Sequence, residues 1–205
     1  MPSQTGIVNA ALALIGGTRI TSLSDGTRNA NVANTLFAQV RDDLLRSHAW
    51  NFATKRLKLA QSGTAPAFGF EHAYPLPPDW LRTILVAGDE EGGRSIEHQV
   101  EEVAGQRAIV TDHDEVWLRY VMRVEDPNMM TADFVSAFRL ALARDMAVSI
   151  AASNTLQANL QQQASRALAR ARSSDSLGQT PEQRPRGAWA DVRGGSHHAG
   201  RHGGF

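Results

Sequence analysis

The sequence predicts an α+β fold that is mainly α: a helical bundle with a small inserted antiparallel β subdomain and an extended C-terminal tail. Three observations predict this fold. Apolar residues repeat every four positions in the first and last thirds of the chain, as they do on one face of a helix. A central stretch alternates apolar and polar residues, as a strand does. The final part is rich in glycine and poor in large apolar side chains.

Helices are expected throughout the first 60 residues. Ser3 can cap a helix that starts at Gln4, and Gly16 follows its last apolar residue, Ile15. A turn at residues 24–26 precedes a second helix, whose apolar stripe has a four-residue spacing and consists of Val32, Leu36, Val40 and Leu44. Residues 50–60 are less regular, and we expect them to be helical as well.

The middle of the chain predicts strands instead. Residues 61–78 contain four prolines and two glycines, which argue against a helix. Residues 81–87 and 107–111 form β-type apolar runs, and residues 116–124 alternate cleanly between apolar and polar. Turn residues at 88–93 and 111–114 separate these runs. We therefore expect a small antiparallel sheet inserted between helices.

A long helical stretch follows Pro127. Thr131 can cap it, and its apolar residues keep a four-residue spacing from Phe134 to Leu168. Residues 153–155 mark a kink or a short break. As one rod, residues 131–172 would measure about 60 Å at 1.5 Å per residue, a length that suits an elongated subunit packed beside identical neighbours.

Four regions follow from this pattern. They are the N-terminal helices of the bundle (1–60), the inserted β-rich subdomain (61–126), the long C-terminal helices (127–172) and an extended partner-docking tail (173–205). The tail has seven glycines, two prolines and few large apolar residues, so it cannot bury enough surface to fold alone. Trp189 stands among arginines in this tail, and Trp and Arg dominate interface energetics.

Composition excludes several classes of protein. The 205 residues carry 21 basic and 21 acidic side chains, whereas a dedicated nucleic-acid binder normally has a basic excess. Without cysteine, the chain has no disulfide, thiol nucleophile or cysteine-ligated metal. The apolar run at residues 7–15 is too short to span a bilayer and lacks the basic start of a signal peptide. We expect a protein that folds in a cytoplasm.

The neutral average conceals charged blocks. Residues 1–60 carry seven basic and three acidic groups, and residues 86–115 carry nine acids and two arginines. Residues 161–205 carry seven arginines and three acids. Such blocks either attract copies of the chain or a partner through complementary faces, or are solvated surface charge. The sequence leaves both interpretations open.

Catalytic and metal-binding motifs are weak. Asp112, His113, Asp114 and Glu115 are adjacent between two expected strands, where alternation points neighbours to opposite faces, so a solvated turn is favoured over a metal site. The histidines 197, 198 and 202 have no supporting carboxylate. No nucleophile elbow, phosphate-binding loop or dinucleotide-binding turn is present. We expect no catalytic residue, no metal site and no cofactor, and therefore no enzyme.

Four ordered blocks nevertheless resemble one family. The first block consists of residues 11–16 and 20–25, and the third consists of residues 74–82. The second block, residues 41–53 with Arg56, is the most specific. The fourth block consists of Asp126-Pro127, Phe134 and the Ala/Leu-rich helix that follows. In order and spacing they resemble the tail tubular protein A family, the head-to-tail adaptors of short-tailed bacteriophages. The resemblance covers roughly residues 5–172. The chain departs from the family in residues 86–115 and in the tail, where the family has no fixed pattern.

This resemblance implies a structural virion protein, assembled in the host cytoplasm. It implies a dodecameric ring that docks under the portal protein, continues the DNA channel for genome retention and ejection, and meets a downstream tail or nozzle protein. DNA would pass without sequence-specific binding, and no membrane is involved. The C-terminal segment of the family reaches into the portal, so the candidate portal-binding residues are Trp189, Arg193, Arg201 and Phe205.

Three alternatives stay open from the sequence. Adaptors of long-tailed phages and of gene transfer agents are similar. The arginine- and tryptophan-bearing arm would also suit a nucleic-acid-binding module, with Trp189 stacking on bases and the arginines on phosphates. A metal-dependent enzyme at Asp112 to Glu115 is the third alternative.

Overall fold

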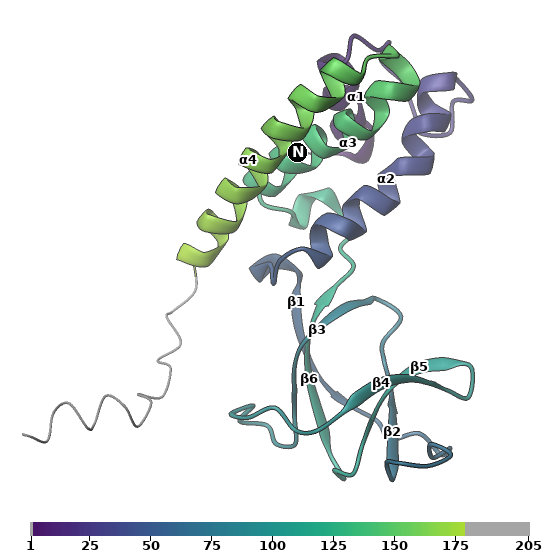
Figure 1. Ribbon diagram of the computed structural model, residues 1–205, viewed down its shortest axis with the longest axis vertical. Helices are drawn as coiled ribbons and strands as arrows, with labels where there is room; N and C mark the ends of the chain where they lie inside the picture. The colour runs from purple at the N-terminus through teal and green to yellow at the C-terminus, as the bar shows by residue number, and fades with distance from the viewer. Residues whose placement is uncertain (1, 179–205) are drawn as a thin grey trace, which may run out of the picture.

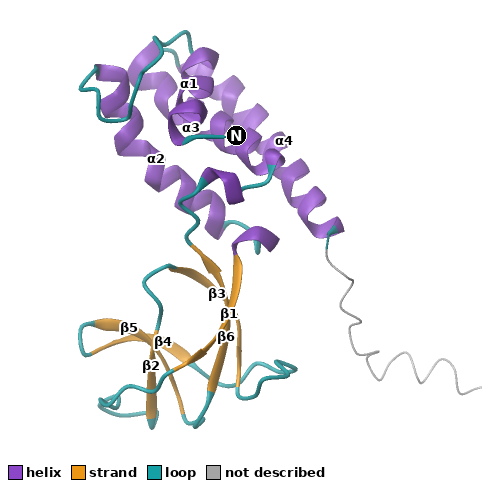
Figure 2. Ribbon diagram, turned by 180° about the vertical axis from the view of Figure 1, so that it is seen from behind, coloured by secondary structure: helices purple, strands orange, loops and turns teal. Residues whose placement is uncertain are grey.

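The computed structural model describes residues 2–178, and it has an α+β fold that is mainly α, as predicted. Four helices lie together at one end of an elongated body, and six strands lie at the other end (Figures 1 and 2). The chain builds two helices, then the strands, then the last two helices. The β part is therefore an insertion between the two halves of the helical bundle. The predicted tail lies almost wholly outside the described residues.

Each helix of the bundle starts at a side-chain cap. The helices are α1 (Gln4–Leu14), α2 (Arg28–Arg46), α3 (Ala132–Ala151) and α4 (Asn154–Leu177). The hydroxyl of the preceding residue accepts a hydrogen bond from a backbone N–H in the first turn of each helix; the caps are Ser3, Thr27, Thr131 and Ser153. The predicted caps at Ser3 and Thr131 are confirmed.

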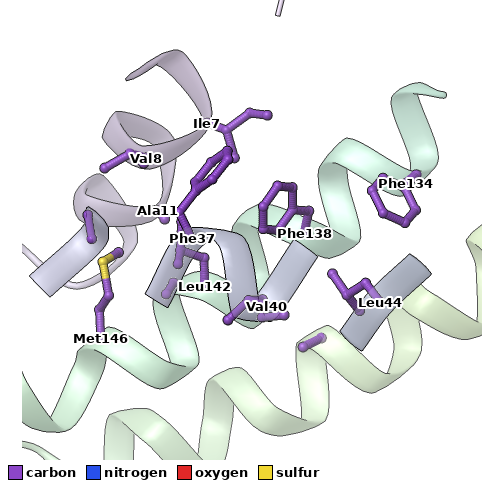
Figure 3. Close-up of a cluster of buried hydrophobic side chains, with 14 of the residues drawn as sticks. Ile7, Val8, Ala11, Phe37, Val40, Leu44, Phe134, Phe138, Leu142 and Met146 are labelled. Atoms are coloured by element: carbon purple, nitrogen blue, oxygen red, sulfur yellow. The ribbon is translucent and has the colours of Figure 1, made fainter. Parts of the chain in front are cut away.

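The core of the bundle joins α1, α2 and α3 (Figure 3). Phe37 of α2 and Phe138 of α3 pack with ring centroids 4.9 Å apart. Trp50, just after α2, is fully buried and meets Phe134 edge-on at 5.0 Å. Its indole N–H donates to the backbone oxygen of Leu44 at 3.0 Å, which satisfies the one polar atom of that side chain. Trp50 is therefore a packing anchor of the bundle core.

The expected rod over residues 131–172 is wrong. Ala152 adopts a left-handed conformation, with φ of 48° and ψ of 37°, and ends α3. Ser153 then caps α4, which folds back and packs along α3. Leu160, Ala164, Ala167 and Ala171 form the buried stripe of α4, and their small side chains let the two helices approach closely. The break at 153–155 is thus a helical hairpin, and the bundle is compact.

The β part has two three-stranded antiparallel sheets. The first sheet has the order β1 (Thr54–Leu59), β6 (Val116–Met122), β3 (Trp80–Ala87), and the second has the order β2 (His72–Pro75), β5 (Gln106–Thr111), β4 (Gln99–Val103). β3, β5 and β6 confirm the three predicted strands, and the antiparallel pairing is confirmed too. β2 and β4 were not predicted.

The helix expected over residues 50–60 is wrong. Residues Asn51–Ala53 form a single 3-10 turn, and β1 follows immediately. Within β1, Leu57 lies opposite Leu118 and Leu59 opposite Val116 of β6, so its apolar residues have the two-residue period of a strand. The sheet region accordingly begins at Thr54, before the expected boundary at residue 61.

The two sheets enclose one shared core and touch at two corners. Ser62, just after β1, donates its N–H to the carbonyl oxygen of Ala73 in β2 at 2.7 Å, and Ile96, before β4, donates to Val86 of β3 at 3.0 Å. The buried side chains between the sheets are Leu59, Tyr74, Val86, Ile109, Val116, Leu118 and Tyr120. The result resembles a small, partly open barrel with two splayed corners.

Polar contacts attach the barrel to the bundle. Asp42 of α2 accepts hydrogen bonds from Arg41 Nε and from Arg123 Nε, both at 2.9 Å, and Arg123 directly follows β6. Arg41 is buried, so its charge needs this carboxylate. We call this junction between the bundle and the barrel the waist.

Candidate assembly surfaces

The four predicted portal-binding residues, Trp189, Arg193, Arg201 and Phe205, lie outside the described residues. The structure does describe the point from which their segment leaves the body. α4 ends at Leu177, whose side chain is 88% exposed, and Gly178 follows beside Asn51 at the waist. The last described residue, Gly178, therefore lies at the waist, between the two ends of the body (Figure 1).

Asp175 anchors this departure point. Its two carboxylate oxygens accept the backbone N–H of Asn51 at 3.1 and 3.2 Å, and the Asn51 side chain donates to the Asp175 carbonyl oxygen at 2.7 Å. His48 Nε2 lies 3.3 Å from the same carboxylate. The Asp175 side chain is only 3% exposed, so these contacts are shielded from water. Residues 124 positions apart in sequence thus fix the end of α4.

The four-residue acidic cluster forms a turn, as predicted. Asp112 accepts the backbone N–H of Glu71, Asp114 lies 3.2 Å from His72 Nε2, and Glu115 accepts from Lys58 Nζ at 2.6 Å. The hydrogen bond and charge of Lys58 hold the pKa of Glu115 below its ordinary value. The carboxylates point to different partners and do not converge. Among residues 2–178, no group of three His, Asp or Glu side chains is placed to hold a metal ion.

Two open grooves mark the barrel surface. One, of about 400 Å³, lies between residues 64–70 and strand β4. The other, of about 280 Å³, lies over the outer face of the first sheet, where Arg56 and Trp117 lie near the acidic residues 89–91.

One loop tip is strongly apolar. Phe68, between β1 and β2, is 89% exposed, and Gly69 beside it has φ of +91°. An aromatic ring standing in water on a protruding loop is typical of a binding contact. The sequence analysis did not single out Phe68, because a lone phenylalanine in a Pro- and Gly-bearing stretch does not reveal its exposure.

Part of the basic block and part of the acidic block lie on two strand edges of opposite charge. Within the described chain, β1 pairs only with β6 and β4 only with β5, so each has one open edge. β1 carries Lys55, Arg56 and Lys58, whereas β4 carries Glu101 and Glu102. Both strands are mostly exposed. The structure thus places part of each block where another chain can reach it.

Two histidines pack against neighbouring side chains in the scaffold. His48 packs on Trp50 with ring centroids 4.9 Å apart, and His72 contacts Asp114 and Gln61, in line with structural roles.

In the described part of the chain, no helix is both long and apolar enough to cross a membrane. No protein-family model matches the chain, and no curated protein matches it.

Proposed function

We propose that this chain is a structural virion protein, the subunit of a head-to-tail adaptor ring that docks on a phage portal and continues its DNA channel. The observation that carries the proposal is the two-ended body, with a helical bundle at one end and a barrel at the other (Figure 2), and with the end of α4 at the waist. An adaptor must present different surfaces to the components above and below it, and this body has two different ends.

The blocks that resemble the adaptor family support the proposal by their positions. The second block contributes Asp42 and Trp50, which hold the waist and the nearby core. The third contributes Asp79, which accepts from Tyr120 at 2.9 Å and pairs with Lys55 at 3.3 Å. The fourth contributes Asp126, whose side chain caps the 3-10 turn leading back to the bundle. Residues of the second and fourth blocks thus lie where the barrel joins the bundle, and Asp79 of the third block makes its contacts within the barrel.

Each part of the chain takes a role in this proposal. The bundle forms the body of the ring, and the barrel, with Phe68 at a loop tip, faces the downstream tail or nozzle protein. The C-terminal segment binds the portal through Trp189, Arg193, Arg201 and Phe205. A formal charge of zero suits a conduit, because numerous phosphate contacts would hold DNA through counterion release instead of letting it slide.

A truncation tests the role of the C-terminal segment. Removing residues 179–205 leaves α4 and the Asp175 contacts intact, so we expect an unchanged circular dichroism spectrum and melting temperature. The full chain should co-sediment with portal rings of the same phage, and the truncated chain should not. Undiminished co-sedimentation of the truncated chain would refute this role.

The same pair of proteins tests the nucleic-acid alternative. If the arm binds nucleic acid, the full chain binds DNA in a salt-dependent way and the truncated chain does not. Portal binding without such DNA binding favours the adaptor. DNA binding without portal binding favours the nucleic-acid-binding module.

A further inference from the structure

We propose that neighbouring copies of this chain join head to tail through their strand edges, with β1 of one copy pairing antiparallel with β4 of the next. Within residues 2–178, no strand pairs along the outer edge of β1 or of β4, and the hydrogen bonds at the two corners come from Ser62, after β1, and from Ile96, before β4. Each strand therefore offers a row of backbone donors and acceptors to a further strand. Pairing them would extend the first sheet of one copy into the second sheet of its neighbour. The strand pairing itself does not depend on the proposed function. Only the closure of the paired copies into a ring rests on it.

Charge complementarity identifies a second copy as the partner. β1 has three cations and no acid, and β4 has two acids and no cation. Like edges would place equal charges opposite each other, which is unfavourable, so β1 disfavours β1 and β4 disfavours β4. The favourable combination is β1 with β4, and it requires two copies in a head-to-tail arrangement.

A single register satisfies both charge and apolar contacts. With Leu57 opposite Val100, Arg56 falls opposite Glu101 and Lys55 opposite Glu102, by the one-to-one pairing of antiparallel strands. Leu57 and Val100 are 39% and 43% exposed in the free chain, and the pairing would cover both. One apolar contact and two charge pairs thus come from one alignment.

The faces of the two sheets agree with this register. Leu57 lies opposite Leu118 of β6, and Val100 lies opposite Ile109 of β5; Leu118 and Ile109 both belong to the shared barrel core. The joined strands would keep their core-facing side chains on one side. A slip of one residue would turn Leu57 to the opposite face from Val100, so the alternation selects the register.

Existing ion pairs do not block the edge. Lys55 pairs with Asp79 and Lys58 with Glu115, but the lysine side chains remain 49% and 46% exposed. Exposed pairs contribute little and rearrange easily. Within residues 2–178, no ion pair holds Arg56 or Glu101. The Arg56–Glu101 pair is therefore the central charge contact of the interface.

Because the two edges are different surfaces, the contact is heterologous. A heterologous contact generates a closed ring when the rotation between copies closes, and otherwise a filament. The adaptor function requires closure. The contact itself requires only that each copy offer β1 to one neighbour and β4 to the other.

Engineered cysteines test the register, since the natural chain has none. In the full chain, the double variant Leu57→Cys/Val100→Cys should give a ladder of dimers, trimers and higher species on a non-reducing gel after mild oxidation. The matched control Leu57→Cys/Glu101→Cys places the two thiols on opposite faces and should lose the ladder. Equal ladders from both variants, or none from the first at high protein concentration, would overturn the register.

Charge reversal tests the pairing without a cross-link. Arg56→Glu and Glu101→Arg should each shift the full chain to monomers in sedimentation velocity. Mixing the two variants should restore assembly, because every junction of an alternating mixture has opposite charges. Each variant must keep the wild-type circular dichroism spectrum. Assembly unaffected by either change, or a mixture that stays monomeric, would contradict the pairing.

These outcomes separate the inference from the adaptor proposal. If the wild-type chain forms rings on portals but the cysteine pair does not cross-link, the edge pairing is wrong and the adaptor function stands. If the ladder forms and the chain never docks on a portal, the pairing stands and the adaptor function is wrong. If the cysteine variant in phage particles cross-links to a different protein and not to other copies of the chain, the strand edge binds another partner and the inference is wrong.

Discussion

Asp175 links the last turn of α4 to the start of the β part. Its carboxylate accepts the Asn51 N–H and lies beside His48, in a nearly water-free site. A buried carboxylate is stabilised only when such donors surround it, so the site depends on every member. In the proposed adaptor, these contacts hold the segment that leads to the portal at a defined point.

We expect Asp175→Ala to lower the free energy of unfolding by about 1–3 kcal/mol, because the contacts of the buried Asp175 carboxylate with the Asn51 N–H are lost. Urea denaturation followed by circular dichroism measures the change. The neighbouring substitution Ser174→Ala, on the exposed side of the same helix, is the matched control and should shift the value by less than about 0.5 kcal/mol. Equal effects of the two substitutions would show that the Asp175 contacts do not stabilise the fold.

The buried Tyr120 hydroxyl makes the free energy of unfolding depend on pH in the alkaline range. Burial raises the pKa of its hydroxyl above the ordinary value, and the hydrogen bond to Asp79 and the charge of Asp79 raise it further. A folded pKa above the unfolded pKa means that this stabilisation is fully present below about pH 10 and is lost as pH rises toward the folded value. Burial and the nearby Asp114 and Glu115 raise the pKa of Tyr74 in the same direction.

The free energy of unfolding of the wild-type chain should therefore fall above about pH 10, and Tyr120→Phe should flatten that fall. Urea titrations at a series of alkaline pH values measure it. Since the chain has only two tyrosines, Tyr74→Phe is the natural comparison and isolates the Tyr120 contribution. An identical pH profile for wild type and Tyr120→Phe would contradict the role of the buried hydroxyl.

The hairpin of α3 and α4 depends on one strained residue, Ala152. Ala152 has φ of 48°, a left-handed conformation that a residue with a Cβ adopts at a cost of about 1–2 kcal/mol. Nothing but this residue and the Ser153 cap separates the two helices. The turn lets α4 fold back on α3, and the buried alanine stripe of α4 compensates for its strain.

Ala152→Gly should stabilise the chain by about 0.5–1 kcal/mol, because glycine adopts the left-handed conformation without a Cβ clash and only part of the gain is offset by unfolded-state entropy. Thermal melts detect the shift. Ala158→Gly, at an exposed position inside α4, should instead destabilise by about 1 kcal/mol. A loss of stability in Ala152→Gly would show that the turn is not strained.

Elements with strong periodicity were predictable, and elements defined by distant partners were not. The helix at α2, the stripe of α3 and the alternation of β6 depend on local sequence, and these predictions hold. Within the predicted stripe of α2, Val40 and Leu44 are buried, and Val32 and Leu36 are only partly buried. β1 carries Lys55, Arg56 and Lys58 around two leucines, and only its pairing with β6 makes it a strand. The short edge strands β2 and β4 likewise lack a strong apolar pattern.

The candidate surfaces, too, were predictable from the sequence only in part. The charge blocks were visible in the sequence, but their concentration on two open strand edges required the topology. The contact of Asp175 with Asn51 joins residues far apart in the chain, and no local pattern predicts it. The predicted tail residues, including Trp189, lie outside the described residues, and their role stays a prediction.

At the scale of the whole molecule, the fold offers three separate surfaces. The bundle and the barrel occupy opposite ends (Figure 1), the end of α4 lies at the waist, and the oppositely charged strand edges belong to the barrel. In the proposed adaptor, the strand edges join copies laterally, the C-terminal segment reaches the portal, and Phe68 faces the next tail component. Each contact can then be removed by a substitution or truncation that leaves the others intact.

Electron microscopy of the full chain, imaged alone and with portal rings of the same phage, tests the adaptor proposal most directly. The account predicts a ring of copies stacked coaxially on the portal, with the barrels on the side away from it and a continuous central channel. A chain that stays monomeric beside unoccupied portal rings, or that attaches without forming a ring, would contradict it.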